Sequence, residues 1–134
     1  MDKEAILFAN EAFYRAFADR DVAAMEALWA DTLPVVCIHP GWSPLAGRED
    51  VMESWRAILG STHAPAIICR SATAYQYGDA AAVVCYEAIG DNFLVATNIF
   101  VRQSGRWRMV HHQAGPTNQA PPPESEEEEA PRPN

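Results

Sequence analysis

Val36-Cys37-Ile38-His39-Pro40-Gly41-Trp42 is an apolar, strand-like run that stops at a histidine, a Pro-Gly pair and a tryptophan. Because proline and glycine interrupt strands, the histidine is expected where a strand ends, at the mouth of a core. An unperturbed histidine has a pKa of about 6.5 and can exchange protons near neutral pH, and Trp42 offers a flat apolar wall. The stretch therefore predicts a pocket for a small molecule.

Helical periodicity flanks this stretch on both sides. Apolar residues recur at intervals of three and four over residues 3–18, which predicts a helix with one core-facing side. Asp21 is expected as the N-cap of a second short helix that ends near Asp31. A third helix is predicted over residues 51–58, stopped by Gly60.

The remainder is typical of four strands, rich in Ile, Val, Thr, Tyr and Phe, at residues 65–77, 80–89, 92–103 and 106–114. Short connections with Gly and Asx residues separate them, as between antiparallel neighbours. Helices first and a meander afterwards predict an α+β fold, a curved antiparallel sheet packed on three N-terminal helices.

Length and composition predict one domain and an acidic tail. The chain has 134 residues, of which 49% are hydrophobic, and a net charge of −8. Five glutamates and one arginine give residues 116–134 a charge of −4, so the rest carries only −4. We expect a domain at residues 1–116 and a disordered Pro/Glu-rich tail at 117–134, either a solubilising appendage or a docking peptide for a basic partner. Without a basic stripe, neither nucleic acid nor a membrane is an expected partner.

The cysteines and the N-terminus predict the cellular compartment. Cys37, Cys69 and Cys85 each lie in an apolar strand-like run without CxxC spacing, which favours buried, reduced thiols. No basic segment followed by an apolar run opens the chain, and no window approaches eighteen apolar residues. We therefore expect a soluble cytoplasmic protein.

The element order, together with several short motifs, resembles the SnoaL-like branch of the nuclear transport factor 2 superfamily over about residues 3–116. The motifs are Leu28-Trp29-Ala30-Asp31, His39-Pro40-Gly41-Trp42, Gly47-Arg48-Glu49-Asp50-Val51, Ser54-Trp55, and the segments 96–101 and 105–112. The resemblance implies a cone-shaped α+β domain. The superfamily includes ketosteroid isomerases, polyketide cyclases, epoxide hydrolases, dehydratases, kinase association domains and noncatalytic transport factors, so the fold leaves the chemistry open.

The chain departs from two catalytic patterns of the superfamily. His39-Pro40 falls where ketosteroid isomerases carry an Asp-Pro whose carboxylate is the general base. The tyrosine that those enzymes use as an oxyanion donor would fall nearest Phe13, with Tyr14 one residue off. The aspartate, arginine, aspartate relay of the epoxide hydrolases is not recognisable either.

Three residues are candidates for acid–base catalysis: His39, Glu87 and His111. Glu87 lies in an apolar strand, where a carboxyl without a partner should have a raised pKa. Strand alternation places His111 on the same face as Trp107, and we assign that face to the cavity, which leaves His112 on the other face, toward a subunit partner. Two of the candidates also have a structural interpretation: His39 could fix the following loop, and Glu87 could lie at an exposed edge or bond to a side chain of a neighbouring strand.

Seven residues are candidates for binding a ligand, although packing or sheet contacts could equally explain most of them: Tyr14, Trp42, Trp55, Tyr86, Asn98, Trp107 and Gln113. The adjacent histidines His111 and His112 point apart, which disfavours a shared metal ion. We predict no metal and no cofactor.

Both faces of the strands are apolar, so we predict a homodimer through the sheet, as is common in the resembled superfamily. The first hypothesis for function is an uncharacterised SnoaL-like domain that binds a small, largely apolar molecule in an internal cavity. A lyase, isomerase or hydratase with His39 as general base or acid is the second. A dimerisation module without catalysis is the third.

Overall fold

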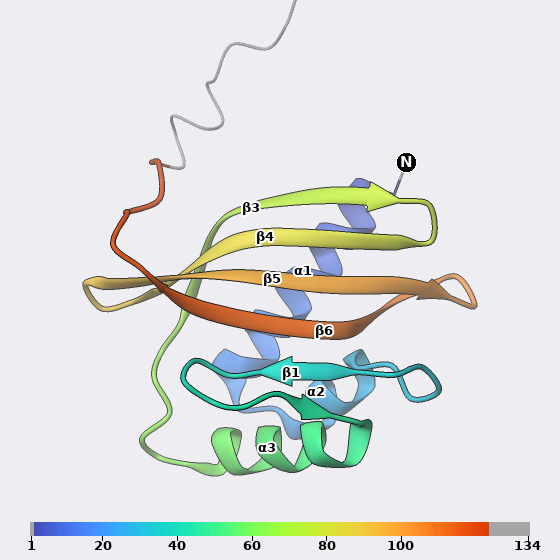
Figure 1. The fold of residues 1–134 in the computed structure, drawn as a ribbon, viewed down its shortest axis with the longest axis horizontal. Coiled ribbons are helices and arrows are strands. Elements are labelled where there is room, and N and C mark those ends of the chain that lie inside the picture. The colour runs from blue at the N-terminus through green and yellow to red at the C-terminus, as the bar shows by residue number, and fades with distance from the viewer. Residues whose placement is uncertain (1, 124–134) are drawn as a thin grey trace, which may run out of the picture.

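A computed structural model describes residues 2–123 as one α+β domain (Figure 1). The helices are α1 (Lys3–Asp19), α2 (Val22–Leu28) and α3 (Arg48–Gly60). The strands are β1 (Val36–Ile38), β2 (Leu45–Ala46), β3 (Ile68–Tyr77), β4 (Ala80–Ile89), β5 (Asn92–Gln103) and β6 (Arg106–Thr117). The predicted fold class, with three helices packed on a curved sheet, is confirmed.

Local sequence signals account for the helix ends. The α1 helix stops at Arg20, which adopts a left-handed conformation with a φ of 54°. The Asp21 side chain accepts a hydrogen bond from Ala24 N at 3.0 Å, so the predicted N-cap of α2 is confirmed. Gly47, with a φ of 96°, precedes α3, and this region of backbone space favours glycine. These signals determine where α1 ends, before β1, and where α2 and α3 begin, before and after β1 in the chain.

The six strands form one sheet in the order β2-β1-β6-β5-β4-β3. Strands β3 to β6 form the antiparallel meander that the turn residues predicted. Strand β1 adds to β6 in parallel, with Val36 opposite His111, so the sheet is mixed. The two-residue strand β2, which the sequence pattern does not reveal, pairs antiparallel with β1. His39 therefore lies beside the end of the meander.

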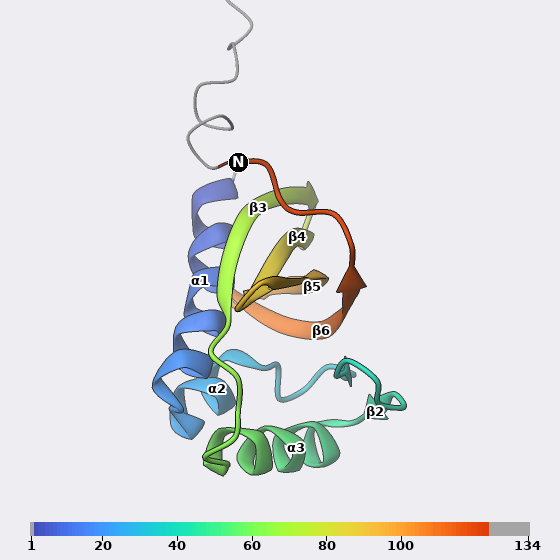
Figure 2. The ribbon, with the colours of Figure 1, turned by 90° about the vertical axis from the view of Figure 1, so that its left-hand side faces the viewer.

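The helices cover one face of the sheet (Figure 2). Helix α1 lies along the meander and α3 lies across the end formed by β1 and β2. Arg48 ties α3 to the end of α2, because its guanidinium donates to the carbonyls of Glu26, Trp29 and Ala30. The core fills the space between these helices and the sheet, and it includes Ile6, Phe13, Met25, Trp29, Val51, Trp55, Val83, Phe100 and Met109.

The ordered chain extends past the boundary expected at residue 116. Strand β6 runs to Thr117, and Pro121 is buried. Ser71 Oγ donates to the carbonyl of Pro122 at 3.5 Å, which places this segment beside β3. The acidic run Glu126–Glu129 of the predicted tail lies outside the described residues. Over residues 2–123, no helix has the length and apolar character needed to cross a membrane.

Candidate functional site

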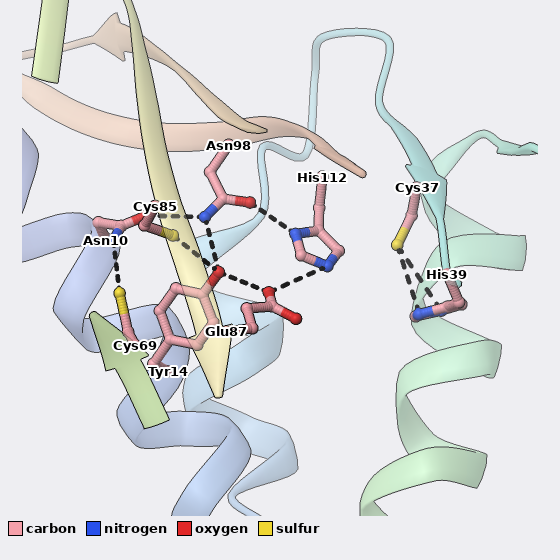
Figure 3. Close-up of polar contacts among 9 residues, drawn as sticks. All are labelled: Asn10, Tyr14, Cys37, His39, Cys69, Cys85, Glu87, Asn98 and His112. Carbon is pink, nitrogen blue, oxygen red and sulfur yellow. Dashed lines mark hydrogen bonds and ion pairs between the residues drawn. The ribbon is translucent and has the colours of Figure 1, made fainter. Parts of the chain in front are cut away.

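Nine side chains with polar or thiol groups meet between α1, α3 and the sheet (Figure 3). We call this set the interior polar cluster; it consists of Asn10 and Tyr14 of α1, Cys37 of β1 and the following His39, Cys69 of β3, Cys85 and Glu87 of β4, Asn98 of β5, and His112 of β6. All are buried apart from the half-buried Cys69. Since buried polar groups need hydrogen-bond partners, the pairing inside the cluster determines what chemistry it can perform.

Asn98 is the central connection of the cluster. Its Nδ2 donates to Asn10 Oδ1 at 2.8 Å and to Tyr14 Oη at 3.2 Å. The amide oxygen is thereby left to accept from His112 Nδ1 at 2.5 Å. Asn10 Nδ2 in turn donates to Cys69 Sγ at 3.7 Å. The donors run in one direction, which assigns the proton of a neutral His112 to Nδ1 and the lone pair to Nε2.

Glu87 is a buried carboxyl with no lysine or arginine of the described residues beside it. Tyr14 Oη donates to Glu87 Oε2 at 2.6 Å, and the same hydroxyl lies 3.3 Å from Cys85 Sγ. His112 Nε2 is 4.0 Å from Glu87 Oε2, which is longer than a hydrogen bond. Within the described part of the chain, no lysine or arginine lies within ion-pair distance of Glu87. The carboxyl is therefore stabilised by the neutral hydroxyl of Tyr14 and not by a cationic side chain.

Burial shifts the pKa values of several titratable groups in the cluster. It raises the pKa of Glu87, although the hydrogen bond from Tyr14 offsets part of this effect. Burial and then the charge of Glu87 raise the pKa of Tyr14 well above its ordinary value. Burial, with smaller contributions from His39 and His111, lowers the pKa of His112 to about 3. Because His112 is neutral at physiological pH, it supplies no positive charge to pair with Glu87.

His39 lies at the second end of the cluster. Its Nε2 is 2.9 Å from Ser54 Oγ, and Ser54 gives its own proton to the carbonyl of Val51 at 2.7 Å. The Ser54 oxygen must then accept from His39, so Nε2 carries the proton and Nδ1 has the lone pair. Cys37 Sγ lies 3.6 Å from the same Nε2. Burial lowers the pKa of His39 to about 4, so this imidazole is neutral at physiological pH.

Aromatic rings form the walls of the cluster. Phe13 packs edge-on against Trp55, with 5.4 Å between ring centroids, and its ring lies 4.8 Å from that of His112. Trp55 also packs edge-on against His39 at 4.8 Å. On the outer side, the ring of Trp42 lies 4.7 Å from that of His39 and is 48% exposed. The pair His39 and Trp42 is thus the place where the cluster meets the surface.

The structure brings five of the predicted site residues together: His39, Glu87, Tyr14, Trp55 and Asn98. Trp42, predicted as a pocket wall, stands at the surface end of the same group. The other predicted site residues lie elsewhere.

The placement of His111 and Gln113 toward the interior is wrong. A bulge interrupts β6: Phe100 pairs with Met109 and Ile99 pairs with His111, so Val110 has no partner. The extra residue inverts the alternation, and His112 rather than His111 points inward. His111 is half-buried and Gln113 exposed on the outer face of the sheet.

Tyr86 and Trp107 also lie away from the cluster. Tyr86 precedes the inward-facing Glu87 on a regular strand, so its side chain is on the outer face. Trp107 is buried at the opposite end of β6, with the Arg102 guanidinium 5.4 Å above its ring. There it lines a surface groove of about 490 Å³ between α1, α2 and the β5–β6 turn, together with small residues such as Ala5, Ala12 and Ala27.

Sequence reasoning missed Asn10 and Ser54 as members of the site. Asn10 lies four residues before Tyr14, so both share one face of α1, and this spacing was the available signal. Ser54 lies beside Trp55 on α3, but the sequence gives no reason to pair it with the loop after β1. Among residues 2–123, no three His, Cys, Asp or Glu side chains are arranged to hold a metal ion.

Comparison with known proteins places the domain in a family. The sequence profile of the SnoaL-like domain matches residues 6–118. A solved structure from Streptomyces avermitilis, named as a candidate dehydratase of the NTF2-like family, is 31% identical. It superposes with a TM-score of 0.79 over 88% of this chain and 97% of that one.

Two further similar proteins carry other names, and one of them is about twice as long. A structure from Thiobacillus denitrificans, named as a candidate calcium/calmodulin-dependent protein kinase type II association domain, is 34% identical, with a TM-score of 0.69 over 82% of this chain and 93% of that one. The F-box protein SKIP8 of Arabidopsis thaliana is 30% identical over 113 residues. These cover 82% of this chain but 48% of SKIP8, so the chain spans about half the length of that relative. The family profile and the similar structures together show that the chain belongs to the SnoaL-like family within the NTF2-like superfamily.

Proposed function

We propose that the interior polar cluster binds a small, largely apolar molecule that enters past His39 and Trp42. The observation that carries the proposal is the carboxyl of Glu87 beside the neutral imidazole of His112, both buried behind aromatic walls without a cation. An unpaired buried carboxyl is costly, and binding or catalysis explains why a protein would keep one. An uncharged ligand with one polar group matches both the pair and its walls.

Entry requires movement of the loop between β1 and β2. Residues 40–44 are exposed, and β2, which ends the loop, is only two residues long. Few buried contacts hold such a segment, so it belongs to the part of the fold that opens at low cost. Trp42 covers His39 from this loop and would move with it.

The test is a fluorescence titration with Prodan, an uncharged apolar fluorophore that carries one ketone. Binding in the interior predicts a saturable blue shift of its emission, with one molecule bound per chain. Trp42→Ala should weaken binding about threefold to tenfold, the contribution of one aromatic contact. Tyr77→Ala is the matched control, because Tyr77 is an exposed aromatic residue on β3, 69% accessible. Absence of saturable binding, or equal effects of the two variants, would refute the proposal.

A lyase of the dehydratase type is the second candidate. The 31% identity to the Streptomyces avermitilis protein favours it, as does a carboxyl with a raised pKa 4.0 Å from a neutral imidazole. Loss of water from a β-hydroxy ketone needs a base for the α-proton and an acid for the leaving hydroxyl, and His39 or His112 with Glu87 could supply both. Ultraviolet absorption of an enone formed from such a ketone would detect the reaction, and Glu87→Gln should abolish it. An equally active variant would exclude Glu87 as the acid.

We also propose that the chain forms a homodimer through the outer face of the sheet. Half-buried side chains on this face include Val84, Tyr86, Val95, Ile99 and Val110. None of the described helices covers them, and an apolar sheet face is stable only when covered. The likeness to a protein named as an association domain supports assembly, with or without catalysis.

A further inference from the structure

A groove on the outside of the helices is separate from the interior polar cluster. It lies between α1, α2 and the β5–β6 turn, and its volume is about 490 Å³. Its long walls are mostly alanines of the two helices, namely Ala5, Ala9, Ala12, Ala24 and Ala27. Because alanine side chains extend little above a helix surface, they leave an open apolar trough where the two helices meet. None of the nine side chains of the interior polar cluster lines this trough.

Side chains of β6 close the groove near the start of α1. This wall consists of Arg106, Trp107 and Arg108. Its position follows from Arg102, whose guanidinium lies 5.4 Å above the Trp107 ring and forms an ion pair with Asp2, the residue before α1. Since Trp107 is only 8% exposed, its ring is a fixed apolar surface at this end of the trough.

The two arginines of this wall retain free hydrogen-bond donors. Arg108 Nη1 donates to the carbonyl of Ala27 at 2.8 Å, so the side chain spans from β6 to α2 and keeps most of its donors unused. Arg106 is exposed and makes no hydrogen bond or ion pair with any residue that the structure describes. Although the chain has a net charge of −8, none of the described residues that line the groove has a carboxylate side chain. This end of the groove therefore has a local positive potential.

The surface beyond the groove has the opposite charge. A second hollow continues along α1 past Phe8 and Ala12, and its charged residues are Glu11, Arg15, Asp19 and Asp21. The excess of carboxylates there disfavours an anion. An anionic group is thus favoured only at the end of the groove that Arg106 and Arg108 form.

The chemistry of an occupant follows from this arrangement. An apolar chain fits the alanine trough, and a guanidinium presents paired donors in one plane, which match the two oxygens of a carboxylate. We propose that the groove binds an elongated apolar carboxylate whose anionic group pairs with Arg106 and Arg108. Its chain lies along α1 from Ala5 to Ala12, a stretch of about 10 Å at a rise of about 1.5 Å per residue. This ligand differs from the uncharged molecule proposed for the interior, and the two sites are independent.

An NMR titration of ¹⁵N-labelled protein tests the inference with octanoate, octanol and octylamine, which differ only in the head group. Octanoate should bind about threefold to fivefold more tightly than octanol, the contribution of one exposed ion pair, and high salt should remove this preference. Octylamine should bind more weakly than either, because the arginines repel it. Octanoate should move the amide resonances of Ala12 and Gly105, which line the groove, and leave that of Asn98 in the interior unchanged.

The variant Arg106→Gln assigns the preference to the arginine wall. It should bring the affinity for octanoate down to that for octanol, because the ion pair is lost. Arg56→Gln is the matched control, since it removes the same charge from an exposed side chain of α3 that does not line the groove. The control should leave the affinity for octanoate unchanged.

A second pair of variants tests the trough. Ala24→Phe fills it and should weaken octanoate and octanol alike by about tenfold, since roughly two methylene groups lose their contacts. Ala23→Phe is the matched control, because Ala23 is exposed on the same helix and does not line the groove.

The outcomes separate this inference from the interior binding function. Equal affinities for octanoate and octanol, tightest binding of octylamine, or equal effects of Arg106→Gln and Arg56→Gln would overturn it. Resonance changes at Asn98 without changes at Gly105 would also overturn it and assign the carboxylate to the interior. Arg106 is exposed, so Arg106→Gln should fold, and it decides even if Ala24→Phe alters the packing of α2. Prodan should bind equally well to free and octanoate-saturated protein, whereas displacement of Prodan by octanoate would show that the two sites are not independent.

Discussion

At the scale of single residues, Glu87 shows how burial and partners together set a protonation state. A carboxyl in an apolar strand was expected to have a raised pKa without a partner, and burial does raise it, while the Tyr14 hydroxyl limits the rise. His112 provides no compensating charge, since its own pKa is lowered to about 3. Protonation of His112 requires a more acidic solution than protonation of Glu87, so the two do not become an ion pair as the pH falls.

Glu87→Gln should therefore change how stability depends on pH. Since folding raises the pKa of Glu87, its contribution is fully present below the unfolded value of about 4.3 and is lost as the pH rises through the folded value. Over that window the stability of Glu87→Gln relative to wild type should rise by up to about 1.4 kcal/mol per pH unit. Urea unfolding at pH values from 5 to 8 measures this difference.

The comparison with wild type isolates Glu87 from the histidines. His39 and His112 act with the opposite sign: their pKa values are lowered to about 4 and about 3, so their contributions are lost as the pH falls below the unfolded value. Wild type and Glu87→Gln both retain these histidines, so the contributions of the histidines cancel in the stability difference. Glu53→Gln, exposed on α3, is the matched control for the loss of one carboxylate. A pH-independent difference between Glu87→Gln and wild type would mean that folding does not raise the pKa of Glu87.

At the scale of secondary structure, periodicity was sufficient for most elements but not for the last strand. The helices and the hairpin turns follow from local signals such as the Asp21 cap and the Gly78-Asp79 turn, which act within a few residues. The orientation of His111 and His112 depends on the register with β5, and a bulge is invisible in a pattern that is apolar on both faces. The parallel pairing of β1 with β6 is likewise a tertiary contact, so the sequence could supply His39 and Glu87 as candidates but not their partners.

Deletion of Val110 tests whether this residue is the extra one. The shortened strand would keep Met109 and His112 on the inner face, so the fold should survive with a loss of about 1–2 kcal/mol in unfolding free energy. Deletion of Val95, from a regular part of β5, would shift Ala96 or its neighbours to the wrong face and should prevent folding. Circular dichroism and urea unfolding compare the two deletions. Equal tolerance of both, or loss of folding in both, would show that the bulge does not define the orientation of His112.

At the scale of the whole molecule, the sheet separates two surfaces of different composition. Its inner face, under α1 and α3, holds the polar cluster, and its outer face carries half-buried apolar residues. The bulge in β6 couples them, because it assigns His112 to the interior and His111 to the outer face. A second copy of the chain on the outer face would stiffen the sheet that holds Glu87, Asn98 and His112. Assembly and ligand binding would then both depend on the same sheet.

The proposed homodimer should have twice the mass of one chain, and a single substitution on the outer face should halve that mass. In sedimentation experiments at micromolar concentrations, the wild type should have twice the chain mass of 14.8 kDa. Ile99→Lys places a charge at the middle of the outer face, where Ile99 lies between Ala82 and His111, and should give monomers that keep the wild-type circular dichroism. Phe8→Lys is the matched control, since Phe8 is 70% exposed on α1, which covers the opposite face of the sheet, and it should remain dimeric. A monomeric wild type, or an Ile99→Lys protein that stays dimeric, would rule out this face, whereas monomers that bind Prodan as tightly as the dimer would show that the interior site is complete within one chain.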